Sequence, residues 1–374
     1  MSSGSTASPA RLWAELVRYC TYDSHVHTAR DALSELRDED LGYSPIPEVA
    51  LDWDANWRWP CVQTPRRLLA HLTFAARHYA NGLVGEKGAE RSREWIPANL
   101  ADAMGSAQGL VARLEQTLAL LCEGVVGLTD EGLLEPACET WDGTRVKGFV
   151  VMDGAILHVA WHLGQIAMLV DWHRAQADGQ RLAPPAGPPG PFAYPGERDW
   201  SAFGVGTRTE ALLRLSEAAF RESPWHPLRR VVEGMTQHEL AWRPFPDIEN
   251  PWFCRAMWTL VLHTWSPKIV YIDHAFGERT LDYGPSSDAI AGCGWGETDP
   301  TKELTALDRA QQWLMEHVSR ATDEDLDRVN PMHINHPMTG WQVVACMAQH
   351  DAWHAGQLSL MRDLYAALWN MRQP

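Results

Sequence analysis

The sequence HVAWHLGQ at residues 158–165 recurs as HDAWHAGQ at residues 350–357, an offset of 192 residues (350 − 158). Each copy places two histidines four residues apart, His158 with His162 and His350 with His354. In a helix this spacing puts both imidazoles on one face, one turn apart. Two imidazoles in that arrangement can bind one metal ion, as they do in other helical zinc motifs. The repeated octapeptide therefore predicts two helices that each present a pair of metal ligands.

A third histidine in each half of the chain keeps the same offset. His71 and His263 are 192 residues apart (263 − 71), and they lie in the apolar runs LLAHL and LVLHT. A single histidine on an apolar helix face is usually a core residue with a satisfied hydrogen bond. Three matched pairs, in a chain with 16 histidines, favour a metal site in each half. The alternative is that duplicated helices inherited the same core histidines.

Helical periodicity dominates the whole sequence and predicts an all-α fold. Apolar residues at three- and four-residue spacing indicate four helices in each half. The predicted ranges are 9–37, 63–84, 101–126 and 148–176 in the first half, and 207–234, 254–277, 301–321 and 340–370 in the second. Thr64 followed by Pro65 is typical of a helix start. Pro224 and Pro227 should kink or split the helix predicted over 207–234.

A proline- and glycine-rich stretch, APPAGPPGPFAYP at residues 183–195, separates the two halves. Such a stretch cannot continue a helix and is typical of a semi-rigid connector. We therefore expect a first domain over residues 1–180, a linker over 181–206 and a second domain over 207–374. Each domain is expected to be a four-helix bundle.

Composition restricts the kinds of partner. The net charge is −16 and no basic run occurs, which argues against nucleic acid and against anionic membranes. The seven cysteines form no CxxC pair, which indicates a reducing compartment. The N-terminus has no apolar core of a signal peptide, and the most apolar stretch, 110–128, carries three charged residues. We expect a cytoplasmic protein that binds a small-molecule substrate.

The motif HxxxHxxQ, with a helix-borne histidine 87 residues upstream (158 − 71) and the whole set present twice, resembles the DinB-like metal-binding superfamily over most of each half. This resemblance implies an up-down-down-up four-helix bundle, with one ligand on the second helix and two on the fourth. It implies two ligand sets: His71, His158 and His162 in the first half, and His263, His350 and His354 in the second.

The activity expected from this resemblance is metal-dependent. Three neutral imidazoles leave an open position on a divalent ion, as in catalytic rather than structural sites. Similar proteins include S-transferases that use thiols such as bacillithiol or mycothiol, thiol-dependent isomerases and some amide hydrolases. We therefore expect a thiol S-transferase, with a metal-dependent hydrolase or isomerase as the alternative. A third possibility is a non-enzymatic protein in which the metal only stabilises the bundle.

The expected cofactors are about two divalent ions per chain, with Zn²⁺ as the default and Ni²⁺ or Fe²⁺ as alternatives. A low-molecular-weight thiol would be the co-substrate. Single-domain proteins of this kind often look like homodimers. We therefore expect the two copies to pack about a pseudo-twofold axis, as an intramolecular pseudo-dimer in a monomeric chain.

Gln165 and Gln357 lie one turn beyond the second ligand of each motif, where their amides could orient a histidine or a bound water. The alternative is a buried amide that bonds to a neighbouring helix. Trp161 and Trp353 precede ligands and are expected in the core. His27 and His226 occupy matching places, 199 residues apart (226 − 27), and a surface position is favoured for both. His333 and His336, which precede the last helix, are expected to be solvated.

Overall fold

The computed structural model describes residues 8–24, 28–46, 64–83, 105–139, 145–191, 205–222, 227–248, 256–281, 299–332 and 336–372. The first half contains α1 (Pro9–Arg18), η1 (Tyr19–Asp23), α2 (Ala29–Leu33), η2 (Asp38–Asp40), α3 (Pro65–Leu83), α5 (Ala107–Val126), α6 (Asp130–Leu134) and α7 (Gly148–Ala177). The second half contains α8 (Arg208–Glu217), η4 (Ala218–Glu222), α9 (Leu228–Val232), α10 (Gln237–Ala241), α11 (Met257–Phe276), α13 (Pro300–Arg320), α14 (Asp323–Asp327) and α15 (Gly340–Asn370).

Strands are confined, within the described residues, to two short antiparallel pairs. These are β1 (Pro136–Glu139) with β2 (Arg145–Lys147), and β3 (Val329–Pro331) with β4 (Pro337–Thr339). One pair directly precedes α7 and the other directly precedes α15. The predicted all-α class is therefore confirmed.

The long helices begin and end near their predicted positions because local signals define them. Pro65 starts α3, and the Thr64 hydroxyl accepts a bond from the N–H of Arg67 at 3.4 Å. The helices α7 and α15 cover 148–177 and 340–370, against predicted ranges of 148–176 and 340–370. The metal-ligand motif therefore lies in the interior of a 30-residue helix in the first half and a 31-residue helix in the second.

The prediction of one continuous helix over 9–37 is wrong. The helix continues through η1 only to Asp23, and Ser24 is extended, with φ −60° and ψ 139°. A new helix, α2, starts after Thr28, whose hydroxyl accepts a bond from the N–H of Asp31 at 3.1 Å. Short polar side chains compete with the helix for backbone hydrogen bonds, so the cluster around Asp23 and Ser24 favours a helix end over continuation.

The split expected in the first helix of the second half is confirmed. After α8 and η4, the described chain resumes at Pro227, which is the N-cap of α9. Proline has no N–H to donate and fixes its own φ, so it cannot continue the preceding helix but can start the next one.

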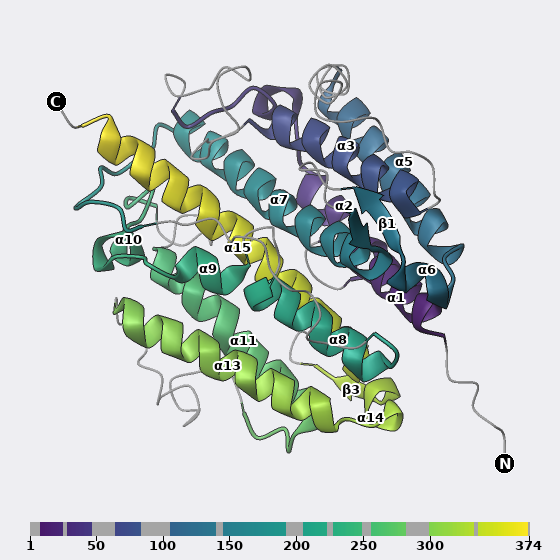
Figure 1. The fold of residues 1–374 in the computed structure, drawn as a ribbon. Helices are drawn as coiled ribbons and strands as arrows, with labels where there is room; N and C mark the ends of the chain where they lie inside the picture. The colour runs from purple at the N-terminus through teal and green to yellow at the C-terminus, as the bar shows by residue number, and fades with distance from the viewer. Residues whose placement is uncertain are drawn as a thin grey trace, which may run out of the picture.

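The helices are arranged in the spatial order α5, α3, α7, α15, α11 and α13 (Figure 1). The two fourth helices lie side by side in the middle, and each is flanked on its outer side by the second and then the third helix of its own half. Both α7 and α15 are buried on nearly every face over most of their length because they lie between two bundles. This arrangement places both octapeptide motifs close to the centre of the molecule.

The contact between α7 and α15 is reciprocal. A Cβ on Gly164 would overlap the Trp353 carbonyl oxygen, and a Cβ on Gly356 would overlap the Trp161 carbonyl oxygen. The two backbones therefore approach as closely as glycine allows. Because each residue of the contact has its counterpart 192 residues away, the two octapeptides contact each other in the manner that a twofold axis produces.

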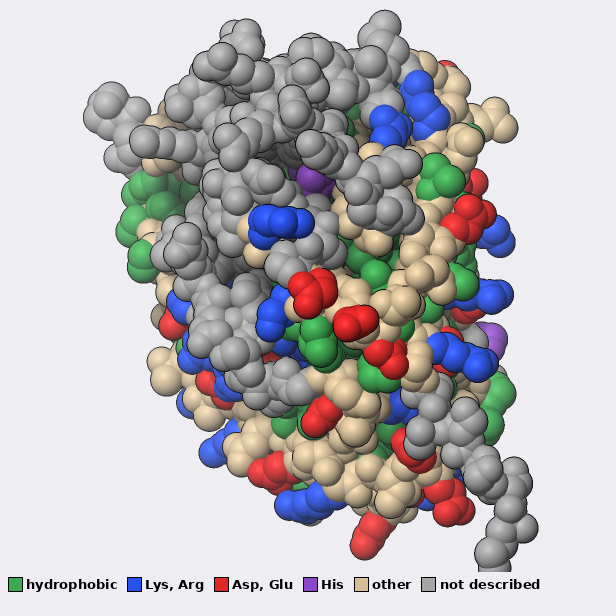
Figure 2. Space-filling view, turned by 45° about the vertical axis from the view of Figure 1, so that its right-hand side comes forward, with side chains coloured by type: hydrophobic (Ala, Val, Ile, Leu, Met, Phe, Trp, Pro, Cys, Tyr) green, Lys and Arg blue, Asp and Glu red, His purple; other side chains and the backbone are tan. Residues whose placement is uncertain are grey.

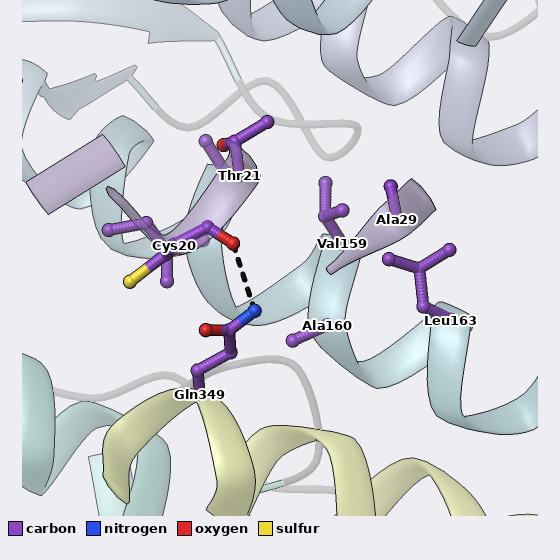
Figure 3. Close-up of a pocket in the computed structure, with 9 residues that line it drawn as sticks. Cys20, Thr21, Ala29, Val159, Ala160, Leu163 and Gln349 are labelled. Carbon is purple, nitrogen blue, oxygen red and sulfur yellow. Dashed lines mark hydrogen bonds between the residues drawn. The ribbon is translucent and has the colours of Figure 1, made fainter. Parts of the chain in front are cut away.

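Polar contacts between the halves surround this crossing. The Arg214 guanidinium of α8 donates to the Asp153 carboxylate of α7 at 2.9 Å, and both side chains are almost fully buried. The Gln349 amide donates to the Cys20 carbonyl oxygen at 2.9 Å, beside a cavity of about 10 Å³ (Figure 3). A cavity of that size holds about one water molecule, so it is no substrate site.

The first part of the proline-rich stretch packs on the second half. The hydroxyl of Tyr365 in α15 donates to the Gly187 carbonyl oxygen at 2.8 Å, and the Trp242 indole donates to the Ala183 carbonyl oxygen at 3.1 Å. The guanidinium of Arg362, also in α15, reaches the Pro191 carbonyl oxygen at 3.3 Å. Residues 183–191 are therefore attached to the second bundle, and the part of the predicted linker over 192–204 lies outside the described residues.

Of the described helices, only α7 is long and apolar enough to span a membrane, and its apolar part is entirely buried within the protein. That burial is expected of a core helix between two bundles. On the face shown in Figure 2, acidic and basic side chains are interspersed.

Candidate metal centres

The first histidine cluster is assembled from α3 and α7. The Nε2 atom of His158 lies 3.1 Å from Nε2 of His71 and 2.8 Å from Nε2 of His162. His158 and His162 are buried, and His71 is partly buried. The three side chains converge because α3 packs against α7 and because the two α7 histidines are one turn apart.

The second cluster repeats this arrangement between α11 and α15. The Nε2 atom of His350 lies 3.2 Å from Nε2 of His263. The ring of His263 lies 4.9 Å from the ring of His350 and 4.9 Å from the ring of His354, measured between centroids. In each cluster the three nearest ligand atoms all lie within 4.8 Å of one another.

The nitrogen spacing fits a divalent metal ion. Zinc bonds to imidazole at about 2.0–2.1 Å, so two ligands of a tetrahedral zinc lie about 3.3 Å apart. The measured separations of 2.8, 3.1 and 3.2 Å are close to this value. Among the described residues each cluster contains three histidines and no further ligand, which leaves room for an exchangeable position.

The glutamines of the motif bond to the second ligand of each copy. The Gln165 side-chain oxygen lies 2.8 Å from Nδ1 of His162, and the Gln357 oxygen lies 2.6 Å from Nδ1 of His354. A carbonyl oxygen only accepts, so Nδ1 must carry the proton and Nε2 must present its lone pair to the cluster. This is the tautomer that a metal requires, and it is the arrangement commonly found around metal-bound histidines.

Burial favours the neutral form of His71. It lowers the pKa of His71 to about 4, because a charged imidazolium is poorly solvated among apolar helices. At neutral pH the His71 ring therefore offers a lone pair instead of a charge. A site of neutral imidazoles in an apolar bundle is suited to bind a cation.

Tyr79 is a residue of the first site that the sequence interpretation missed. Its hydroxyl lies 3.0 Å from Nδ1 of His158, and the pair is buried. A signal was present in the sequence, because Tyr79 and Tyr271 keep the 192-residue offset of the histidines (271 − 79). Tyr271 is also buried, in α11.

The remaining predicted residues fall into three groups. Trp161 and Trp353 are buried, as expected for core residues. His336 is exposed. Three further histidines, His27, His226 and His333, lie outside the described residues.

The cysteines whose side chains are described do not belong to either cluster. Cys20 and Cys346 are buried, and Cys122 is half-buried. Burial raises the pKa of all three thiols, to about 12 for Cys346 and about 11 for Cys122. Such thiols stay protonated at neutral pH, so none of the three provides a thiolate nucleophile.

Comparison with known proteins supports the assignment of the second half. The family model of the DinB superfamily matches residues 222–358, which include His263, His350 and His354. No curated protein and no solved structure matches the chain. The first cluster lies outside the matched range, so the interpretation of the first half as another copy of the same domain rests on the 192-residue offset and on the geometry described above.

Proposed function

We propose that this chain, in which residues 222–358 belong to the DinB superfamily, is a metal-dependent thiol S-transferase. The observation that carries the proposal is the convergence of three histidine side chains in each half, with one ring nitrogen of each within 4.8 Å of the others. A divalent ion bound there would lower the pKa of a bound thiol or water and polarise a carbonyl.

The chain itself holds and orients the ligands. The Gln165 carbonyl selects the tautomer of His162, and Gln357 does the same for His354. The helices α7 and α15 bury two histidines of each cluster, whereas His71 and His263 are only partly buried. We propose that the substrate enters from the side of His71 and His263.

The proposed reaction uses an external low-molecular-weight thiol. Its S–H proton passes to solvent, the sulfur forms a bond to an electrophilic carbon of the acceptor, and the bond from that carbon to the leaving group breaks, so that the leaving group departs with its electron pair. The need for an external thiol agrees with the buried, protonated state of Cys20, Cys346 and Cys122.

Metal content provides the first test. The purified chain should retain about two divalent ions, measured by elemental analysis after mild dialysis. His158→Ala and His350→Ala should each remove one ion and leave the other site occupied. His317→Ala is the matched control, because that histidine lies on α13 and bonds to the Trp313 carbonyl oxygen at 2.8 Å. Unchanged metal content in a folded His158→Ala variant would mean that the cluster is not the site.

Activity is then tested by incubating the metal-loaded chain with low-molecular-weight thiols and electrophilic acceptors. We expect thioether formation that is lost on chelation and restored by metal. Metal-dependent hydrolysis of an amide without added thiol would contradict the proposed transferase and favour a hydrolase. A metal-loaded protein whose chelation changes only the melting temperature would support a stabilising role for the ions.

A further inference from the structure

We propose that Tyr79 is a positioning residue of the first metal centre. This inference rests on the proposed metal-binding function of the histidine clusters. The hydroxyl of Tyr79 acts through His158, which it orients from the side opposite to the cluster.

The geometry places His158 between two side chains of the same helix. On α3, His71 faces Nε2 of His158 at 3.1 Å, and Tyr79, eight residues further along (79 − 71), faces Nδ1 at 3.0 Å. Side chains of α3 therefore lie within hydrogen-bonding distance of both ring nitrogens of His158. The ring planes of Tyr79 and His158 are inclined at 69°, with centroids 6.2 Å apart, so the tyrosine contacts the nitrogen edge of the imidazole and does not stack on it.

The position of the proton on the His158 ring determines the role of the Tyr79 hydroxyl. A neutral imidazole has one N–H, and a nitrogen that bears hydrogen cannot bind a metal. For Nε2 of His158 to join the cluster, its proton must be on Nδ1, which then donates to the Tyr79 oxygen. Gln165 imposes the same choice on His162 through its carbonyl oxygen. The two ligands of α7 thus have different supporting groups, a hydroxyl from another helix and an amide from their own.

The position of this tyrosine is repeated along with the ligands. Tyr271 follows His263 by eight residues (271 − 263), as Tyr79 follows His71. The chain has only eight tyrosines, so a match at the offset of the histidines is unlikely to arise by chance. Tyr271 is buried in α11, on the helix that supplies His263.

The test is Tyr79→Phe, which removes the hydroxyl and keeps the ring. The full chain is titrated with Zn²⁺ in competition with a chromophoric chelator, and Co²⁺ absorption is recorded for both sites. We expect one of the two ions to bind about 10- to 100-fold more weakly, as is typical when a group that supports a metal ligand is lost. The absorption of one Co²⁺ site should change, and the other should stay the same.

Tyr43→Phe is the matched control. Tyr43 is a buried tyrosine of the same half, its ring packs against His173 at 4.9 Å, and its hydroxyl has no hydrogen-bond partner among the described residues. Its substitution should leave both metal affinities unchanged. If Tyr79→Phe and Tyr43→Phe show the same two affinities as the original chain, Tyr79 only packs and the inference is wrong. If the original chain itself binds no ion, the proposed function fails before the tyrosine is tested.

Discussion

Each candidate ligand has two ring nitrogens, and the group bonded to the second one decides whether the first can bind a metal. Gln165 and Gln357 accept from Nδ1 of the nearest histidine, and Tyr79 contacts Nδ1 of His158. At the scale of single residues, the chemistry of the site therefore depends on these partners as much as on the histidines. An imidazole without such a partner would divide between two tautomers, and only one of them binds a metal through Nε2.

The cysteines allow a test at the same scale. Burial raises the pKa of Cys20 and Cys346, so only a small fraction of either thiol is ionised at pH 7.5. We expect both to react slowly with iodoacetamide in the folded chain and quickly after denaturation. Mass spectrometry of the labelled peptides assigns the rate to each cysteine. Rapid labelling of Cys20 or Cys346 in the native state would contradict their burial and reopen the possibility of a protein-borne thiol nucleophile.

At the scale of elements, the pair α7 and α15 determines where both clusters lie. Gly164 lies between the ligand His162 and its partner Gln165, and it contacts the backbone at Trp353. Trp353 directly precedes the ligand His354. This tight contact therefore joins the ligand turn of one octapeptide to the ligand turn of the other.

Gly164→Ala tests this crossing. An added Cβ would overlap the Trp353 carbonyl oxygen, which belongs to a backbone that cannot move aside without shifting α15. We expect a loss of about 1–3 kcal/mol of unfolding free energy, the usual cost of overpacking, measured by urea denaturation. Gly356→Ala should cost a similar amount, because the contact is reciprocal. Metal affinity at both sites should fall with it.

Gly109→Ala serves as the control for the helical propensity of alanine. A Cβ at Gly109, in α5, meets only the Ser106 hydroxyl oxygen at 3.4 Å, which is an ordinary contact. Alanine there should be neutral or stabilise by up to about 1 kcal/mol. A Gly164→Ala variant as stable as Gly109→Ala would show that the two helices are not in tight contact.

At the scale of the whole molecule, the two bundles stabilise each other. The crossing of α7 and α15 buries apolar residues from both halves, and the buried pair Asp153–Arg214 joins the first bundle to the second. Separation of the halves would leave the Asp153 carboxylate without its partner and expose the apolar face of α7. A buried carboxylate without its partner is destabilising, and an apolar face exposed to water favours association.

Residues 1–180 expressed alone should therefore self-associate or be poorly soluble. Light scattering coupled to size-exclusion chromatography measures the mass, with the full chain as the control, which we expect to be a monomer. Self-association through α7 would reproduce the contact with α15, since the two helices carry the same Trp and Gly positions. A monomeric, soluble, metal-loaded fragment would show that the bundles are independent and that the contact between them is dispensable.

Several features of the protein follow from the sequence alone. The helical class, the bounds of α3, α7, α11 and α15, and the sets of three histidines are local or periodic properties. The spacing of four residues guarantees that His158 and His162 share a helix face, whatever surrounds them. The helix-start signal at Thr64 and Pro65 also acts over a few residues. The 192-residue offset then connects the sets without any knowledge of their positions in space.

Tertiary structure alone decided the rest. The break after Asp23 is an exception, because its cause is local: short polar side chains compete with the helix for backbone hydrogen bonds, and helical periodicity does not reveal that competition. The contacts of Tyr79 with His158, of Gly164 with Trp353 and of Asp153 with Arg214 join residues far apart in the chain. Local sequence patterns do not predict which of these distant residues come into contact. The offset of Tyr79 and Tyr271 was visible in the sequence, but only the approach of α3 to α7 shows that the hydroxyl reaches a ligand. The sequence determined which side chains each helix presents, and packing between the helices decided which of them meet, because that depends on how the apolar faces of both bundles are buried together.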